Sequence, residues 1–244
     1  MTISGFLLVL ATAFCHAGWN FFVKRINGGP ELVWLFSVVS FVLYLPVAVY
    51  VFVTEQPVFG WLELAFIAGS ALLHMGYFLL LQQGYKRGDL SLVYPTARAT
   101  GPFLSTSFAV ILLGEQMTPQ LGFGAFLVIG GVVMLTGGFG RDARNMRQSL
   151  LFGIGAGVLI GSYTVWDAYA VAALLVPPLL LDYASSVTRA VILAPVGLKL
   201  LDLVVGHLRD HKWGVIAIAV LNPLAYILVL YAMTFTPVVY VAPV

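Results

Sequence analysis

Charged side chains are scarce in this 244-residue chain, at 9% of residues against about 25% in a soluble globular protein. Apolar residues make up 61%, and the mean hydropathy is +1.00. So little charge excludes an ordinary water-soluble domain. A net charge of +2 also provides no basic surface, so nucleic acid is not an expected partner. The composition therefore predicts a chain that lies in a lipid bilayer.

Cysteine, a basic leader and long polar loops are also scarce or missing. Cys15 is the only cysteine, so no disulfide framework can form within the chain. The first 20 residues lack the basic start of a secretory signal peptide. No metal-ligand or nucleophile pattern is recognisable. We therefore expect no cofactor, no metal and no enzymatic activity, with an integral membrane transferase as the alternative.

Apolar runs long enough to cross a bilayer recur along the sequence. A transmembrane helix needs about 20 such residues, and helices satisfy their own backbone polar groups in lipid. We therefore predict an all-α integral membrane protein. The eight expected spans are 3–23, 31–53, 60–84, 90–113, 119–138, 149–170, 176–200 and 213–234. A ninth begins at Pro237 and reaches Val244.

Short patterns return after 147 to 149 residues, which predicts two copies of one unit. Trp19-Asn20 returns as Trp166-Asp167, and Pro46-Val47 returns as Pro195-Val196. We expect about 40 residues of the second copy, most of helix 9 and all of helix 10, to be absent. The predicted division is a first copy at 1–138, a cytoplasmic linker at 139–148 and an incomplete second copy at 149–244.

The two copies should be inverted with respect to each other. Five helices per copy, an odd number, reverse the direction in which the next copy enters the membrane. Inverted repeats are a signature of secondary transporters. Nearly all of the twelve Lys and Arg residues fall at alternate connections. Since basic loops stay in the cytoplasm, this pattern places the N-terminus outside.

Two arginines fall inside predicted spans. Arg98 lies about 12 Å into the fourth span and Arg189 about 18 Å into the seventh, at 1.5 Å per residue. A central arginine costs about 2.5–3.5 kcal/mol, so each must face protein or water. The planar guanidinium suits a carboxylate or phosphate, which makes both residues candidate substrate ligands. A purely structural partner is the alternative for each.

The surroundings of Arg98 favour a binding site. Tyr94 lies one turn earlier, on the same helical face. Pro95, Gly101 and Pro102 interrupt the regular pattern of this span. Such breaks point to the substrate site in transporters, so these three residues are candidate hinges.

Other polar and aromatic residues lie in the first, third, sixth and seventh spans. His16 and His74 allow proton coupling, because histidine exchanges a proton near neutral pH. Interhelical hydrogen bonding is the alternative for each histidine. Arg189 can pair with Asp167 or Asp182. The remaining candidate substrate-binding residues are Trp19, Asn20, Tyr77, Tyr163 and Asp167.

Two further features have structural explanations. The glycines of the fifth span allow close packing within the chain or contact with a second copy in a homodimer. Glu115, at the turn before that span, is equally well explained as a solvated loop charge. The glycines are Gly122, Gly124, Gly130 and Gly131.

These residues resemble a known family. His16-Ala17-Gly18-Trp19-Asn20 with Lys24 resembles the opening of EamA-type members of the drug/metabolite transporter superfamily. The segment 88–102 resembles the fourth helix of that family, and the Leu113-Gly114-Glu115 turn resembles its connection to the fifth.

The resemblance implies ten helices in two inverted five-helix halves around a central cavity. It also implies export of amino acids, metabolites, sugars or drugs across the bacterial inner membrane. We therefore expect a secondary transporter for a small metabolite or amino-acid-like solute with an anionic group, working by alternating access. A truncated product that transports nothing is a further alternative. Many members of this family have a cytoplasmic N-terminus, whereas the charges of this sequence favour an N-terminus outside the cell.

Overall fold

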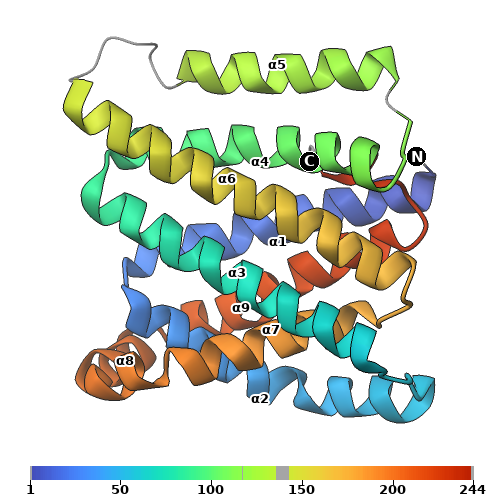
Figure 1. Cartoon of the computed structure of the whole chain (residues 1–244). Coiled ribbons are helices and arrows are strands. Elements are labelled where there is room, and N and C mark those ends of the chain that lie inside the picture. Colours follow the sequence, from blue (N-terminus) through green and yellow to red (C-terminus); the bar gives the residue numbers. More distant parts are fainter. Residues whose placement is uncertain (1, 117, 136–142, 243–244) are drawn as a thin grey trace. The chain divides into compact units, whose positions relative to one another are not determined.

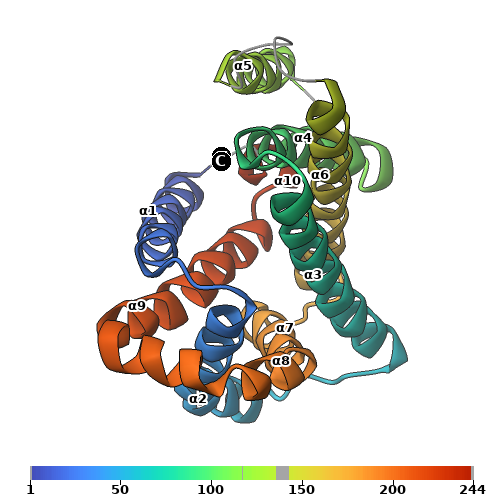
Figure 2. The same cartoon turned by 90° about the vertical axis from the view of Figure 1, so that its left-hand side faces the viewer.

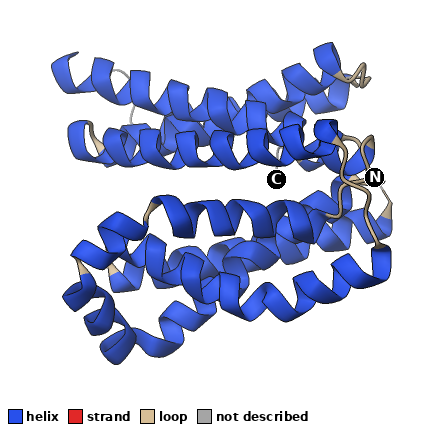
Figure 3. Ribbon diagram, turned by 60° about the horizontal axis from the view of Figure 1, so that its bottom comes forward, coloured by secondary structure: helices blue, strands red, loops and turns tan. Residues whose placement is uncertain are grey.

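The computed structural model describes residues 2–116, 118–135 and 143–242, and every regular element among them is a helix (Figures 1 and 3). Five of these helices are long and apolar enough to cross a membrane. They are α1 (Ile3–Ile26), α2 (Pro30–Glu55), α3 (Trp61–Arg87), α6 (Ala143–Ala172) and α9 (Leu201–Met233). The others are α4 (Leu90–Leu112), α5 (Pro119–Leu135), α7 (Pro178–Ile192), α8 (Ala194–Lys199) and α10 (Val238–Val241). The predicted all-α class is confirmed, and the long apolar helices agree with a membrane protein.

The chain folds as two compact units, each built from two separate stretches of sequence. Unit 1 comprises Met1–Ala71 and Ala170–Phe235, and unit 2 comprises Leu72–Tyr169 and Thr236–Val244. Each unit therefore contains segments from both predicted copies. The division of the sequence into two copies stays a prediction, but residues 143–148 of the expected linker belong to α6.

In unit 1, α9 packs along α1 and α2, and α2 also packs against α7 (Figure 2). Apolar side chains from α1, α2 and α9 form the core of this arrangement. In a bilayer such packing is stabilised by van der Waals contacts between the helices, because lipid tails are as apolar as these side chains. The buried core residues include Leu32, Leu35, Phe36, Val204, Val215, Ile218 and Ala219.

A proline inside α9 explains a hydrogen bond between α2 and α9. Pro223 has no backbone N–H, so the carbonyl of Ala219 has no donor from the next turn. The hydroxyl of Ser40 donates to that carbonyl at 2.8 Å. One turn further along α2, the hydroxyl of Tyr44 donates to the carbonyl of Val220, also at 2.8 Å. Ser40 thus supplies the donor that Pro223 lacks, and Tyr44 adds a second hydrogen bond between α2 and α9.

This explanation predicts an energetic coupling between Ser40 and Pro223. Ser40→Ala should cost about 1–3 kcal/mol, because it leaves the carbonyl of Ala219 without a donor. Pro223→Ala restores a helical donor, so Ser40→Ala in that background should cost clearly less. A double-mutant cycle on detergent-solubilised protein, unfolded with sodium dodecyl sulfate, measures the difference. Equal costs in the two backgrounds would contradict the explanation.

The prediction of one helix over 176–200 is wrong, because the chain breaks after Ile192. Pro195 lies in the first turn of α8 and cannot donate to a preceding turn of α7. The last turn of α7 consequently has backbone carbonyls without a helical donor. The indole N–H of Trp34 donates to one of them, the carbonyl of Ala190, at 3.0 Å. The break is stabilised by a side chain from α2.

The segment before the following span is helical rather than a polar connection, whereas the predicted start of that span at residue 213 lies just after a kink inside α9. We expected a polar connection over 199–212 and a span from 213, but α9 already begins at Leu201. The polar part of α9 ends at a kink at His211, where φ is −133° and ψ is 29°. Charged residues such as Arg209 and Lys212 suggested a loop, although they lie on exposed faces of a helix.

In unit 2, a stripe of glycines lets α6 approach α4 closely. A Cβ added at Gly153 would lie 2.6 Å from the Cβ of Thr96, and one at Gly161 would lie 2.8 Å from the Cβ of Leu104. Both distances are too short for real side chains. Small residues at every fourth position are the usual means of close helix packing in membranes. The stripe is Gly153, Gly157 and Gly161, and it faces Thr96, Thr100 and Leu104.

Three of the four glycines of the fifth span, for which we predicted close packing or contact with a second copy, do not pack against another described segment. Among the described residues, a Cβ at Gly124, Gly130 or Gly131 would meet no atom within 4 Å. The prediction of packing within the chain is therefore wrong at these three positions. Contact with a second copy stays a prediction.

Glu115 holds the start of α10. The backbone N–H groups of Val238 and Val239 donate to its two carboxylate oxygens, at 2.8 Å and 2.9 Å. Gly114, immediately before it, has a φ of 69°, a conformation that glycine adopts easily. A carboxylate at the first turn of a helix satisfies N–H groups that have no partner within the helix. Glu115 is thus a helix cap, rather than only a solvated loop charge.

Candidate functional site

Six of the candidate residues form a cluster in unit 2, where α3, α4 and α6 face one another. On each helix the two contributing residues lie three or four positions apart, and hence on one face. Apolar residues pack behind them, including Ala97, Ala156 and Ile160. We call this set the unit 2 cluster: His74, Tyr77, Tyr94, Arg98, Tyr163 and Asp167.

Arg98 carries the positive charge of the cluster. Its Nε donates to the hydroxyl of Tyr94 at 3.2 Å, and its guanidinium carbon lies 5.6 Å from the centre of the Tyr94 ring. The side chain is exposed. Among the described residues, no carboxylate lies within 4.0 Å of the guanidinium. The other N–H groups of the guanidinium form a planar fork, whose geometry suits a carboxylate or a phosphate.

Two more tyrosines extend the cluster around this charge. The phenol groups of Tyr77 and Tyr163 both interact electrostatically with Arg98. Their rings meet edge to face, with 5.9 Å between the ring centres. Tyrosine combines an apolar ring with a polar hydroxyl. The cluster can therefore contact both the charged and the apolar parts of a small organic molecule.

His74 and Asp167 form a hydrogen-bonded pair beside these tyrosines. Nε2 of His74 lies 2.9 Å from Oδ2 of Asp167, and the side chains are 11% and 0% exposed. The imidazole also stacks on the ring of Tyr163, with 3.9 Å between ring centres. The carboxylate of Asp167 is thus a hydrogen-bond partner of His74.

Three candidates on α1 belong to unit 1 and make local contacts there. The amide of Asn20 donates to the carbonyl of His16 at 2.8 Å. The rings of His16 and Trp19 meet edge to face at 5.2 Å. The indole N–H of Trp19 is buried, and no hydrogen-bond acceptor is found for it in the described part of the chain. A binding role for these three residues stays a prediction.

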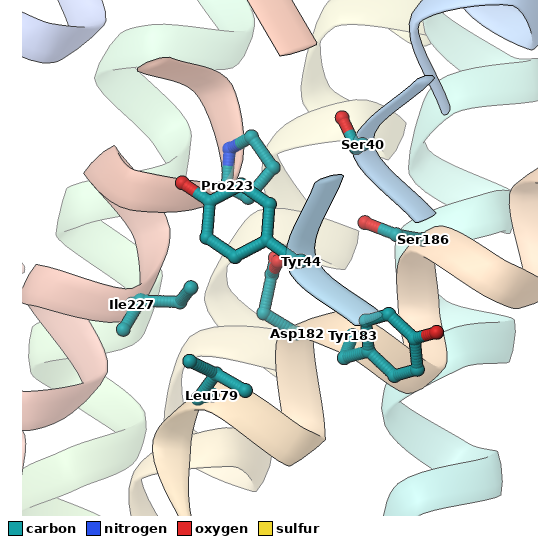
Figure 4. A pocket seen from close by; sticks show the side chains of 8 residues that line it. All are labelled: Ser40, Tyr44, Leu179, Asp182, Tyr183, Ser186, Pro223 and Ile227. Atoms are coloured by element: carbon teal, nitrogen blue, oxygen red, sulfur yellow. The ribbon is translucent and has the colours of Figure 1, made fainter. Parts of the chain in front are cut away.

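Arg189 contacts Ser186, which lines a narrow pocket of unit 1 (Figure 4). Its Nη2 donates to the hydroxyl of Ser186 at 3.0 Å, and it interacts electrostatically with Asp182. These contacts favour the structural alternative for Arg189. Sequence reasoning missed the serines and tyrosines that α2 and α7 bring to this pocket, although their helical spacing could have revealed them. The pocket is lined by Ser40, Tyr44, Leu179, Asp182, Tyr183, Ser186, Pro223 and Ile227.

The helix that carries Arg98 is not broken at its prolines. α4 runs continuously from Leu90 to Leu112 through both Pro95 and Pro102, contrary to the predicted break. Pro102 still cannot donate to the carbonyl of Arg98, one turn earlier. Gly101 is required for packing, because a Cβ there would lie 2.6 Å from Cγ2 of Ile160. A hinge at these residues stays a prediction.

Residues 3–137 match the EamA-like transporter family. No curated protein matches the chain. The matched residues form more than half of the chain, and they include the 16–20 and 88–102 segments that carry the sequence resemblance. The long apolar helices agree with the multi-pass membrane location that such a family requires. The chain belongs to the EamA-like transporter family of the drug/metabolite transporter superfamily.

Proposed function

We propose that this membrane transporter moves a small metabolite or amino-acid-like solute that carries an anionic group. Membership of a transporter family supports transport over the transferase alternative. The observation that carries the choice of solute is the charged side chain of Arg98, a residue that is exposed within unit 2. Tyr94 holds it in place, and none of the described carboxylates neutralises it.

A carboxylate or phosphate on the guanidinium would make charge-assisted hydrogen bonds. Bonds of this kind contribute about 1.5–3 kcal/mol each. The tyrosine faces of the unit 2 cluster suit the remainder of such a solute, because they accept apolar groups and attract ammonium groups. An amino acid offers all of these groups within one small molecule.

Alternating access between two inverted five-helix halves is the mechanism that we propose. Ser37 of α2 and Ser186 of α7 occupy corresponding positions in the two predicted copies, and both are buried. Their helices pack against each other in unit 1, as expected near the axis that relates two inverted repeats. His16, Trp19 and Asn20 would contribute further contacts during the cycle.

Export across the bacterial inner membrane completes the proposal, and family resemblance supports it. Proline and glycine at 95, 101 and 102 would let α4 bend as access changes. A homodimer formed through the open glycine face of α5 fits the same scheme.

Transport by purified protein in liposomes tests this proposal. The solutes should include radiolabelled anionic, zwitterionic, neutral and cationic metabolites, with empty liposomes as the control. We expect saturable uptake of at least one carboxylate- or phosphate-bearing solute, and competition by other anions of similar size. Transport restricted to cationic or uncharged solutes would refute the assignment of Arg98 as an anion ligand.

A further inference from the structure

The first part of α9 runs in a different direction from the rest of the helix. The kink at His211 separates residues 201–210 from the long apolar remainder. In Figure 1 these first residues are seen nearly end-on at the lower left, whereas α1 runs across the view; in Figure 2 they run across the view instead. Because α1 is long and apolar enough to span a membrane, the segment 201–210 lies crosswise to a spanning direction. A helix in the plane of a membrane surface has this orientation.

Two neighbouring features place this segment at the depth of the lipid headgroups. Trp213 follows the kink and is 76% exposed, and tryptophan at the end of an apolar helix is typical of the membrane–water interface. The end of α1 lies at the same level, because a Cβ at Gly214 would lie 3.1 Å from Cδ1 of Ile26. Lys24 and Arg25, in the last turn of α1, therefore mark the same boundary between lipid and water as the kink in α9.

One face of the segment is attached to the rest of unit 1. Val204 is buried in the core that α1, α2 and α9 share, and Nε2 of His207 lies 3.4 Å from Oε1 of Glu31. A second face carries exposed apolar side chains four and three positions apart, and hence in one stripe. An amphipathic helix at an interface inserts such a stripe between the headgroups and the acyl chains. The apolar stripe is Leu201, Val205 and Leu208.

Exposed basic side chains from both helices surround the kink. Nζ of Lys212 lies 5.5 Å from the centre of the Trp213 ring. Among the described residues, the carboxylate within 4.0 Å of this set is that of Asp210, which lies 3.3 Å from Nε of Arg209. Four positive charges and one negative charge leave a clear positive excess at this end of unit 1. We call this set the basic cluster: Lys24, Arg25, Arg209 and Lys212.

We propose that the basic cluster and the segment 201–210 form a binding surface for anionic phospholipid. The phosphate of the lipid accepts hydrogen bonds from the basic cluster, while the apolar stripe and the indole of Trp213 lie against the glycerol and the upper acyl chain. Zwitterionic lipids bind less tightly, because their ammonium groups are repelled by the basic cluster. A soluble phosphate satisfies the charges but leaves the stripe uncovered. This surface goes beyond the proposed transport function and does not depend on the solute of Arg98.

Native mass spectrometry of the full chain in detergent tests the proposal. The protein is titrated with phosphatidylglycerol or, as the zwitterionic control, phosphatidylcholine with the same acyl chains. We expect the first phosphatidylglycerol to bind about tenfold more tightly or better. Lys24→Gln/Lys212→Gln should weaken its binding by about 30-fold, because each basic side chain near an anionic lipid contributes about fivefold. Binding of phosphatidylcholine should change little.

Lys86→Gln/Arg87→Gln is the matched control. It removes the same charge from two exposed residues in the last turn of another apolar helix, α3. The Kd for the first phosphatidylglycerol should stay at the wild-type value. Equal binding of the two lipids, or an equal loss in both double variants, would overturn the proposal. Release of bound phosphatidylglycerol by inorganic phosphate would assign the basic cluster to a soluble anion and would also overturn it.

Cysteine labelling in lipid nanodiscs tests the position of the segment independently of its charge. In a Cys15→Ser background, Val205→Cys places a thiol in the apolar stripe, and Asp210→Cys places one on another face of the same helix. A water-soluble maleimide should modify the Asp210→Cys protein about tenfold faster or more, because lipid excludes the reagent from the stripe. Equal rates of modification would show that the stripe does not lie in the bilayer, and would overturn the proposal.

Discussion

Arg98→Gln should lower the affinity for an anionic solute by about 10- to 100-fold, with little effect on insertion into the membrane. Glutamine keeps hydrogen-bonding ability but removes the charge that recognises a carboxylate or phosphate. The expected loss corresponds to about 1.5–3 kcal/mol for a hydrogen bond to a charged group. Concentration-dependent uptake into liposomes at equal protein content measures the effect.

Three further variants make this result specific. Arg98→Lys keeps the charge but cannot bind an anion through two parallel N–H groups, so it should retain part of the activity. Tyr94→Phe removes the acceptor that holds Nε and should have a smaller effect than loss of the charge. Arg189→Gln, whose guanidinium contacts Ser186 in unit 1, is the arginine control. Normal affinity in the Arg98→Gln protein would exclude Arg98 as the anion ligand.

Gly157→Ala should disrupt the packing of α6 on α4. The added Cβ would overlap the Cβ of Thr100, which belongs to a branched side chain and cannot swing away. The backbone nitrogen of Gly101 lies 3.1 Å from the same position, so the added Cβ cannot move away from Thr100 without approaching the backbone of α4. Overpacking of this kind typically costs about 1–3 kcal/mol. Transport should fall as well, because α4 carries Arg98.

The glycines of α5 provide the matched control. Gly131→Ala makes the same chemical change on another apolar helix, where the added methyl group meets no described atom within 4 Å. We expect unfolding of this variant in detergent to occur at or slightly above the wild-type temperature, since alanine favours helix more than glycine. Equal stabilities of the Gly157→Ala and Gly131→Ala proteins would show that α6 does not approach α4 as described.

Much of the fold follows from composition and periodicity. Runs of apolar residues located the long helices α1, α2 and α3 to within a few residues. They failed over 176–212, where Pro195 ends a helix inside an apolar run and charged residues continue a helix that we expected to end. Hydropathy cannot show such features, because it indicates whether a segment prefers lipid or water and says nothing about its backbone hydrogen bonds.

The site was predicted in part. Residue spacing placed Tyr94 beside Arg98, because residues four positions apart share a helical face. It could not pair His74 with Asp167, which are 93 positions apart on different helices. The role of Glu115 was missed for the same reason, since its partners lie in α10. Contacts between distant segments depend on how helices pack, and a single sequence does not record that packing.

The carboxylate of Glu115 and the amides that it binds are 123 and 124 positions apart. A ribosome adding about 5–20 residues per second needs about 6–25 s to cover that interval. The turn after α4 therefore emerges and enters the bilayer long before its partner exists. During synthesis this carboxylate must rest in the hydrated interfacial layer until the chain that forms α10 has been made.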